Sequence, residues 1–470
     1  MAVTTTFAQF TPGRAVVLKC TNNSAGGGGI LVEYDRAGVT TYNVPLPYSA
    51  TPDPNSIVFG SPASNGTLIH NTSLSADGAF IVVGGYGNAF TSVDSAAGAD
   101  SPRVMATVKY NGVYSRPFSS SVALSAAAFR SSTSDGFGNF WGHGSTPARY
   151  LNTDTAIGTG ACRAIAIVNG NICFTKAPTG LFGVYQVTGT PTSLSSETRI
   201  IDSSLMGSGS TPGGFAIPPN QVVGSIAYLT DYNGNPNRGI GHYHWDGSAW
   251  VWDYNLLLAA SEKPQHIAVD YSGANPFVYV VPTSAVGNHL YAFDDTGSSA
   301  VQLTLATAVG TIFRGVVMAP TQPALPTFTV HPANTTNSYT STATFGPVSA
   351  TNANPNGYTW KKGSTTLVDG PTGNGSTISG ATTTTLTISS VGAADAGTYF
   401  SVASNNGGSA DSSPAQLVLE GSSITTQLTS RTNVAGTTAT FHVVSSGPAP
   451  LSYAWKQGST PLSDGPSPSG

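Results

Sequence analysis

The chain has 470 residues and a net charge of −4, with only 9% charged residues against 39% apolar ones. This length suits two or three domains, and the 19 Tyr, 19 Phe and 6 Trp can build large cores of a kind that disordered chains lack. There is neither the basic cluster that nucleic-acid binding requires nor an apolar run of a length that spans a bilayer, so we expect no nucleic-acid partner and no membrane span.

The first residues, MAVTTTFAQFTPG, lack the charged start and the apolar core of a signal peptide. Two interpretations follow. Either the protein is cytoplasmic, or it is extracellular or at the cell surface and its signal peptide is not present in this chain. The 55 Gly and 31 Pro beside β-branched runs predict an all-β protein of many short strands and tight turns.

Residues 1–320 repeat one phrase, in which a short strand of small and β-branched residues leads through a tight turn to a second strand. A repeat of roughly 50 residues is typical of propeller blades and predicts an N-terminal β-propeller of six or seven blades. The first and last phrases would complete one blade from both ends and remove an exposed sheet edge. An array of β-sandwiches is the alternative. The phrases lie at residues 14–20, 74–86, 129–144, 163–176, 224–232, 265–281 and 313–320.

The three cysteines, Cys20, Cys162 and Cys173, form no metal-binding or redox motif. Cys162 and Cys173 flank a predicted hairpin, CRAIAIVNGNICF, with its turn at residues 169–170. That turn places Cys173 opposite Ala166 and not opposite Cys162. We therefore expect buried free thiols that pack as small apolar side chains.

Residues 231–247, DYNGNPNRGIGHYHWDG, form the stretch richest in side chains that bind ligands. Asp231, Asn233 and Asn235 alternate in the way that oxygen donors do at the first positions of calcium loops. A proline and a histidine stand where such loops carry the sharp-turn Gly and the bidentate Glu. A polar turn between strands is therefore the alternative to a calcium site.

His242 and His244 lie two residues apart and hence on the same face of a predicted strand. Such a pair can bind zinc or copper. No third ligand is identifiable from the sequence, and a solvated strand face is the alternative.

Aromatic side chains accompany these histidines and occur again upstream. Trp245 and Trp250 belong to HYHWDGSAWVWD, and Trp141 and His143 belong to NFWGHG. Flat rings beside Asp, Asn and His suit the stacking of sugars, so we predict these residues, with His242 and His244, as ligand-binding candidates. Packing between strands is the alternative.

Motifs of well-known enzyme classes are absent. The chain contains no G-x-S-x-G, G-x-x-x-x-G-K-[ST], H-E-x-x-H or C-x-x-C-H, and catalytic residues are unknown. A glycosidase needs only two suitably spaced carboxylates, and the chain has 22 Asp and Glu residues. An enzyme therefore stays an open alternative.

A proline-rich segment, residues 321–327, is expected to link the propeller to a region of different composition, which has few large aliphatic residues and long Ser/Thr runs. In that region YTWKKG and then TLTISSVGAADAGTYFSVASNNGGSA resemble bacterial immunoglobulin-like domains. The resemblance implies a β-sandwich over residues 328–420. It further implies that one tryptophan fills the core and that a tyrosine corner follows; these residues are Trp360, Asp395, Gly397 and Tyr399.

Residues 421–470 repeat only the first half of this domain. Trp455 aligns with Trp360, but no second Asp-x-Gly-x-Tyr follows. We therefore expect an incomplete second immunoglobulin-like domain with an open core face and an unpaired sheet edge, as part of a longer tandem array. Self-association, in which a neighbouring molecule supplies the missing strands, is the alternative.

Residues 10–320 resemble a family of secreted bacterial propeller-like domains. The pieces that carry the resemblance are FTPGRAVVLKC, GTLIHNTSLSADGAFIVVGGY, HYHWDGSAWVW and TIFRGVVMAP. The resemblance implies secretion and the propeller fold, and it brings no active site.

These observations favour a non-catalytic extracellular or cell-surface protein, with a propeller head that binds a glycan or another surface ligand on an immunoglobulin-like stalk. One alternative is an extracellular polysaccharide-active hydrolase or lyase with its site at the propeller channel, where acidic or histidine side chains would converge. The other is a structural assembly module of a surface layer or filament.

Overall fold

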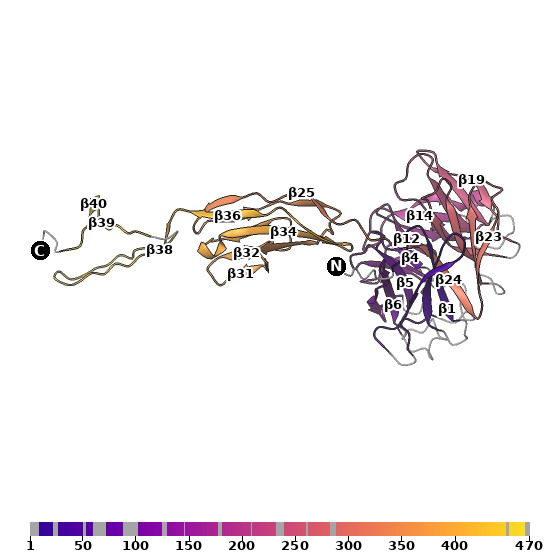
Figure 1. Cartoon of the computed structure of the whole chain (residues 1–470), viewed down its shortest axis with the longest axis horizontal. Coiled ribbons are helices and arrows are strands. Elements are labelled where there is room, and N and C mark those ends of the chain that lie inside the picture. Colours follow the sequence, from indigo (N-terminus) through magenta and orange to yellow (C-terminus); the bar gives the residue numbers. More distant parts are fainter. Residues whose placement is uncertain are drawn as a thin grey trace, which may run out of the picture. The chain divides into compact units, whose positions relative to one another are not determined.

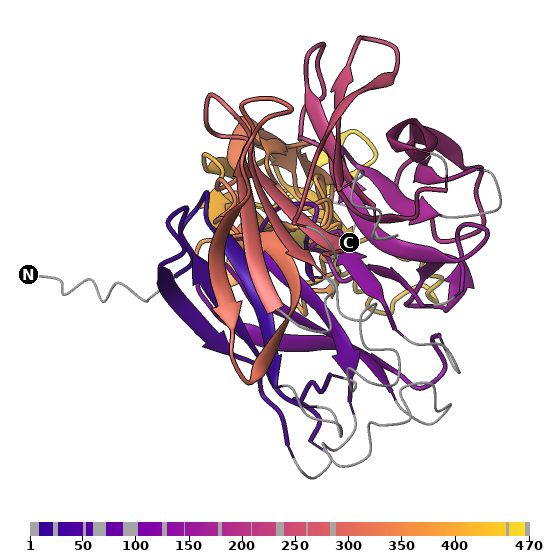
Figure 2. The same ribbon diagram turned by 90° about the vertical axis from the view of Figure 1, so that its right-hand side faces the viewer.

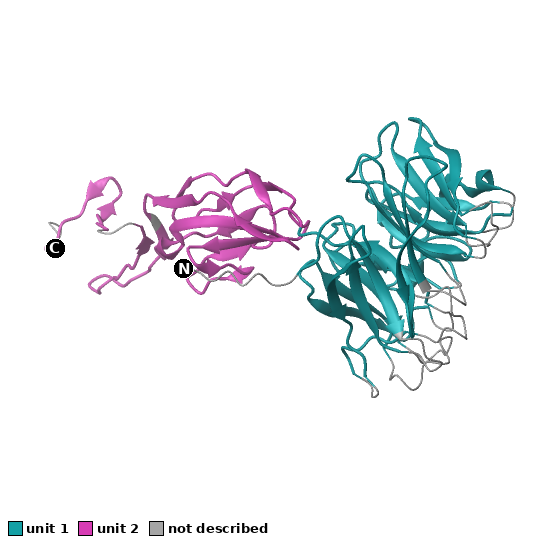
Figure 3. Cartoon of the chain, turned by 45° about the vertical axis from the view of Figure 1, so that its right-hand side comes forward, with its two compact units in different colours: residues 1–322 teal, residues 323–470 magenta. Residues whose placement is uncertain are grey.

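The computed structural model describes most of the chain, which falls into two compact units, residues 1–322 and 323–470 (Figure 3). Each unit has hydrophobic cores of its own. The described residues are 9–21, 27–49, 53–59, 72–87, 102–124, 129–144, 146–176, 181–207, 209–231, 239–259, 262–282, 288–447 and 451–465.

The described residues form an all-β protein, as their Gly-rich turns and β-branched runs predict. Their helical segments are two short 3₁₀ helices, η2 (Ser203–Met206) and η3 (Ala393–Asp395). Within the same residues, no helix has both the length and the apolar character needed to cross a membrane.

Six four-stranded antiparallel sheets make up the described part of the first unit, and we number them I to VI in chain order (Figures 1 and 2). Sheet I contains β24 (Thr311–Met318), β1 (Ala15–Thr21), β2 (Gly29–Tyr34) and β3 (Thr40–Pro45). Sheet II contains β4 (Thr72–Leu74), β5 (Phe80–Tyr86), β6 (Arg103–Lys109) and β7 (Tyr114–Ser120). Sheet III contains β8 (Ser131–Ser134), β9 (Phe140–His143), β10 (Arg149–Tyr150) and β11 (Thr155–Ala156).

The other three sheets follow the same meander. Sheet IV contains β12 (Cys162–Val168), β13 (Asn171–Lys176), β14 (Gly183–Val187) and β15 (Thr198–Asp202). Sheet V contains β16 (Pro212–Ala216), β17 (Ile226–Asp231), β18 (Ile240–Trp245) and β19 (Trp250–Leu256). Sheet VI contains β20 (Pro264–Asp270), β21 (Phe277–Pro282), β22 (Asn288–Asp294) and β23 (Leu303–Ala308).

Sheet I joins the two ends of the first unit, because β1 pairs with β24, with Ala15 opposite Met318 and Val17 opposite Val316. The run Ala15–Leu18 is fully buried. A strand that is covered on both faces reads as an uninterrupted apolar run, and this explains AVVL in the sequence. The predicted pairing of the first and last phrases is confirmed.

The first strands of the sheets contact one another in a closed cycle. The contacts run from β24 to β4, β4 to β8, β8 to β12, β12 to β16, β16 to β20 and β20 back to β24. A cavity of about 260 Å³ lies along these strands, and each of the six contributes to its lining. Lining residues include Ser73, Ser131, Ala164, Gly214, His266 and Val317.

Consecutive sheets bury a shared hydrophobic core, and sheet VI shares one with sheet I. The described residues therefore hold a core at each of the six sheet interfaces. Members of these cores from the two sides are Leu18 and Val83 (I–II), Tyr86 and Phe140 (II–III), Trp141 and Phe174 (III–IV), Val184 and Tyr243 (IV–V), Tyr228 and Val280 (V–VI), and Tyr279 and Val17 (VI–I).

The hairpin of β12 and β13 has the predicted register. Ala166 pairs with Cys173 across a turn in which Asn169 and Gly170 both have positive φ (48° and 76°). Two such residues suit the twist of a two-residue hairpin. The three cysteines are buried and free, as predicted.

The second unit begins with a β-sandwich. One sheet has the order β26-β36-β34-β29-β30 with β35 on β34, the other has the order β27-β33-β32-β31, and β25 pairs with β28. The bounds are β25 (Thr327–Val330), β26 (Thr335–Ser338), β27 (Ala343–Phe345), β28 (Ser349–Thr351), β29 (Tyr358–Lys362), β30 (Thr365–Thr366), β31 (Gly370–Pro371), β32 (Thr377–Ser379), β33 (Leu386–Ser389), β34 (Gly397–Asn405), β35 (Gly408–Asp411) and β36 (Ala415–Glu420).

Trp360 lies at the centre of this sandwich and is fully buried. Its indole Nε1 donates a hydrogen bond to the carbonyl oxygen of Thr383 (2.8 Å). Tyr399 stacks on Phe345 with ring centroids 4.8 Å apart, and its hydroxyl donates to the carbonyl oxygen of Asp395 (2.6 Å). Gly397, between these two residues, has a φ of 141° that disfavours a side chain.

Residues 421–465 form only short hairpins in the described part of the chain. These are β37 (Ser423–Thr426) with β38 (Val444–Ser446) and β39 (Lys456–Gln457) with β40 (Thr460–Pro461). Trp455 is 39% exposed and Tyr453 is 55% exposed, whereas their counterparts in the sandwich, Trp360 and Tyr358, are buried. The same sequence pattern therefore leaves its apolar face open here.

Candidate functional site

The predicted pair Trp141 and His143 is not accessible to a ligand. Both lie on β9 of sheet III and are buried, and Trp141 belongs to the core shared with sheet IV. The Trp141 indole donates to the carbonyl oxygen of Pro191 (2.8 Å). The prediction of these two residues as ligand contacts is wrong, because sheets on either side cover the strand that carries them.

Two buried histidines of the first unit make its stability sensitive to acid. Burial, with the charges of Arg130 and Arg163, lowers the pKa of His143 to about 3, and burial with the charge of Arg314 lowers the pKa of His266 to about 3. The unfolded chain binds protons at these histidines below its ordinary pKa of about 6.5, while the folded chain does not until about pH 3. Stability is therefore fully present above pH 6.5 and falls as the pH is lowered through this window.

We expect the free energy of unfolding of the first unit to decrease by about 1.4 kcal/mol per pH unit for each of these histidines below about pH 6. Urea unfolding of the full chain between pH 7 and pH 5 measures this slope. His143→Asn should reduce the slope, and His266→Asn should reduce it by a similar amount. An unchanged slope in His143→Asn would contradict the prediction.

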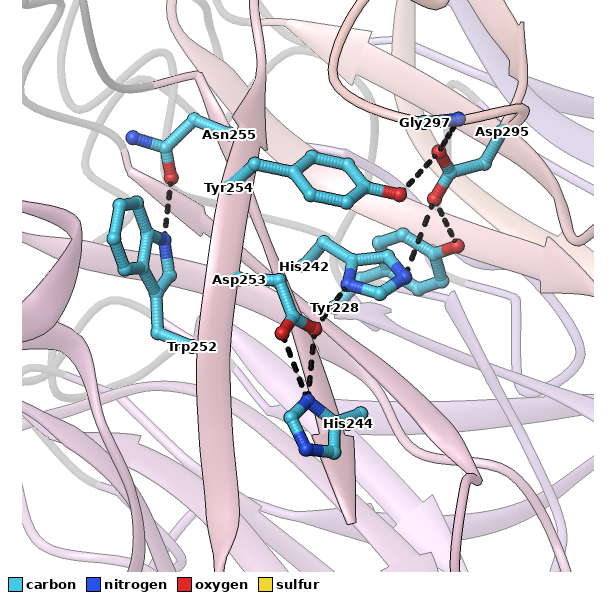
Figure 4. A network of polar contacts seen from close by, with 9 residues as sticks. All are labelled: Tyr228, His242, His244, Trp252, Asp253, Tyr254, Asn255, Asp295 and Gly297. Carbon is cyan, nitrogen blue, oxygen red and sulfur yellow. Dashed lines mark hydrogen bonds and ion pairs between the residues drawn. The ribbon is translucent and has the colours of Figure 1, made fainter. Parts of the chain in front are cut away.

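His242 and His244 lie on the same face of β18, as predicted, and both contact Asp253 of the neighbouring strand β19 (Figure 4). The Nδ1 atom of His242 lies 2.9 Å from Asp253 Oδ2, and the Nδ1 atom of His244 lies 2.8 Å from Asp253 Oδ1. One carboxylate thus orients both imidazole rings. The ring of His242 also stacks on Tyr254, with centroids 4.3 Å apart.

Asp295 extends this network toward sheet VI (Figure 4). It is 6% exposed and accepts hydrogen bonds from the hydroxyls of Tyr228 (2.5 Å) and Tyr254 (2.8 Å), while His242 Nε2 lies 3.7 Å from its Oδ2. Burial and the Asp295 charge raise the pKa of both tyrosines, so both hydroxyls keep their protons and donate. Asp295 Oδ1 also accepts a hydrogen bond from the backbone N–H of Gly297 (3.2 Å), which holds the carboxylate in place. Because both tyrosines belong to sheet V, the network fastens sheet V to sheet VI.

The structure describes one of the three predicted calcium ligands. Asp231 is buried, and its Oδ1 accepts a hydrogen bond from the backbone N–H of Thr211 (2.9 Å). Asn233 and Asn235 lie outside the described residues, so the calcium site stays a prediction. Among the described residues, no three His, Cys, Asp or Glu side chains are grouped closely enough to hold a metal ion.

Trp245 and Trp250 do come together, at the hairpin end of sheet V. Their ring centroids are 5.5 Å apart and the rings are inclined at 58°. The two indoles line a cavity of about 280 Å³ between sheets IV and V, together with Asn169, Gln186 and Gln221. Trp250 is buried and Trp245 is partly exposed. The described residues at this cavity therefore combine aromatic surface with uncharged amides.

The cavity along the first strands has a different character. Its lining is mainly apolar, with Thr72, His266 and Tyr271 among its polar members, and none of the described residues that line it is Asp or Glu. A hydrolase or lyase site at this position would need carboxylates or histidines that converge there. The described lining contains one histidine, His266, and its imidazole is neutral because burial lowers its pKa.

Comparison with known proteins concerns the second unit. Residues 340–414 match the family model of the immunoglobulin domain. The β-sandwich built around Trp360 is therefore an immunoglobulin-like domain, as the sequence predicts. No curated protein matches the chain.

Solved structures resemble the chain through immunoglobulin domains. The titin M3 domain is 23% identical, with 20% of this chain and 96% of that chain covered and a TM-score of 0.17. The titin fragment A168169 is 20% identical, covers 30% and 74%, and has a TM-score of 0.20. Tandem Ig repeats of Dlar are 16% identical, cover 44% and 98%, and have a TM-score of 0.17.

Sequence reasoning missed several residues of these sites. Asp253 follows DGSA in the sequence, and the Asp-Gly pair is a turn signal. A hairpin drawn through that turn would have placed Asp253 near the two histidines. Asp295 and Gln186 come from sheets VI and IV and meet sheet V only through packing between sheets. No local sequence signal identifies such partners.

Proposed function

We propose that this is a non-catalytic extracellular or cell-surface protein. In this proposal residues 1–320 form a six-bladed β-propeller head that binds a glycan or another surface ligand, and immunoglobulin-like domains form a stalk. The head would be joined by a linker at residues 321–327 to a domain at residues 328–420 and to an incomplete one at residues 421–470.

The closed cycle of sheet contacts is the observation that carries the proposal. Each first strand contacts the next, the last contacts the first, and a core lies at each interface between consecutive sheets in the described residues. The strand β24 completes sheet I beside β1, which is how propellers remove the free edges of their first and last blades. In this proposal each of the six four-stranded sheets is one blade.

The rest of the proposal is supported by composition and by the second unit. A surface with few charged residues, in a chain with 9% of them, suits adhesion or matrix association. Immunoglobulin-like repeats serve as spacers in many surface proteins, and the domain at residues 340–414 has a partial copy after it.

Glycan binding by the full chain tests this function. The purified chain should bind at least one member of a broad panel of oligosaccharides and insoluble polysaccharides saturably, and it should release no soluble sugar from the bound polymer. Absence of saturable binding across the panel would refute a glycan-binding head. Release of reducing ends or of unsaturated sugars would instead favour the polysaccharide-active hydrolase or lyase.

A structural assembly module is the second candidate, because the described residues between 421 and 465 include large apolar side chains that are exposed. Sedimentation of the purified chain distinguishes this role, since assembly predicts concentration-dependent association. The exposed residues include Leu428, Phe441, Leu451, Tyr453, Trp455 and Leu462.

A further inference from the structure

The cavity beside Trp245 and Trp250 has the features of a binding site for one sugar unit. Its volume of about 280 Å³ lies just below the range of roughly 300–1,000 Å³ that small-molecule sites span. It therefore admits one ring of a chain and not several. The described residues that line it come from all four strands of sheet IV and its β12–β13 turn, from the hairpin end of sheet V, and from the segment between β16 and β17.

The two indoles provide an apolar corner. Trp250 is 5% exposed and is fixed in the core between sheets IV and V, while Trp245 packs against that core and keeps part of its surface open. An aromatic face carries negative charge density and attracts the weakly positive C–H groups of a pyranose ring. A β-linked glucose unit has its hydroxyls in equatorial positions and presents such C–H groups on both faces.

Amide side chains also line the cavity. They differ in whether their donors and acceptors already make hydrogen bonds within the protein. Asn171 is held at both ends, since its Nδ2 donates to the carbonyl oxygen of Asn169 (3.1 Å) and its Oδ1 accepts from the N–H of Gly189 (2.8 Å). The side-chain amide of Gln221 and the Nε2 group of Gln186 have no hydrogen-bond partner among the described residues. These groups can donate to and accept from sugar hydroxyls.

The charge of the cavity lining determines whether an acidic sugar can bind. The described residues that line the cavity include no Lys, Arg, His, Asp or Glu. Cys173, also in the lining, is a buried thiol whose pKa burial raises to about 12, so it is uncharged as well. The carboxylate of a uronic acid would lose water on entering this cavity and find no cation in return.

We propose that this cavity binds a single unit of a neutral β-linked glucan, with Trp245 as the stacking platform and Gln221 and Gln186 as hydroxyl partners. The inference rests on the proposed glycan-binding function and adds to it the site and the class of sugar. It predicts preference for neutral over acidic chains of the same length.

Calorimetric titration of the full chain with cellohexaose, laminarihexaose and hexagalacturonate tests the proposal. At least one neutral hexasaccharide should bind, and hexagalacturonate should bind at least about tenfold more weakly. Trp245→Ala should raise the Kd of the neutral ligand about tenfold or more, because it removes the stacking face. The matched control is Trp252→Ala. Trp252 lies on the same hairpin, donates to Asn255 Oδ1 (3.1 Å) and is not part of the cavity lining.

A second variant distinguishes loss of binding from loss of folding. Gln221→Leu changes a partly exposed residue and should raise the Kd about fivefold with an unchanged melting temperature. Equal effects of Trp245→Ala and Trp252→Ala, no effect of either cavity variant, or tighter binding of hexagalacturonate would overturn the site. Failure of both neutral hexasaccharides, while another glycan of the panel binds, would overturn it and leave the proposed function standing. Absence of any glycan binding would overturn both.

Discussion

Replacement of Val17 with Asp is expected to abolish the folded state of the first unit or to lower its stability by about 4 kcal/mol or more. Val17 is fully buried on β1, paired with Val32 on one side and Val316 on the other. An aspartate there buries a carboxylate with no partner, which is among the most costly substitutions in a protein core. Calorimetry of the full chain measures the effect.

Val39→Asp provides the matched control for this substitution. Val39 lies between β2 and β3 of the same sheet and is 56% exposed, so its replacement should change stability by no more than about 0.5 kcal/mol. The unfolding of the second unit serves as an internal reference in each scan. Retention of the parental transition by Val17→Asp would show that β1 is not an integral strand of sheet I.

Replacement of Trp360 with Ala is expected to destabilise the immunoglobulin-like domain by about 3–5 kcal/mol. The substitution empties the centre of the core and leaves the carbonyl oxygen of Thr383 without its indole donor. A small domain has a total stability of about 5–15 kcal/mol, so the variant should be largely unfolded at moderate urea concentrations. Hydrogen exchange of peptides from β29 and β34, followed against urea, measures the loss.

Trp455→Ala is the matched control, because Trp455 occupies the same place in the repeated sequence and is 39% exposed. It should leave protection of β29 and β34 unchanged. Trp360→Phe should fall between the two, since it keeps most of the apolar volume and loses the hydrogen bond. Equal effects of Trp360→Ala and Trp455→Ala would contradict the buried position of Trp360.

Local patterns in the sequence were enough to predict individual hairpins and the immunoglobulin-like domain. The turn at Asn169 and Gly170 sets the register of β12 and β13, because a two-residue loop leaves one pairing for the strands. The pairing of β1 with β24 followed from two apolar phrases at the ends of one repeating region. Both predictions use information carried within a single strand pair or a single repeat.

Contacts between sheets could not be predicted in this way. Trp141 and Trp245 occur in similar aromatic, histidine-containing phrases, yet one is buried and the other lines a cavity. The difference depends on which face of a strand meets the neighbouring sheet and on how far along the strand that sheet extends. For the same reason Asp295 was not recognised as the partner of Tyr228 and Tyr254.

Sheet I contains strands from both ends of the first unit, so it cannot be completed during synthesis on the ribosome until β24 has been made. β1 leaves the exit tunnel well before its partner β24, which ends at Met318. At about 5–20 residues per second, the roughly 300 residues between them take about 15–60 s to translate. For that time the apolar strand β1 has no neighbour on one edge, and such an edge is a template for aggregation. Until β24 has emerged, that edge of β1 is therefore open to pairing with the wrong strand.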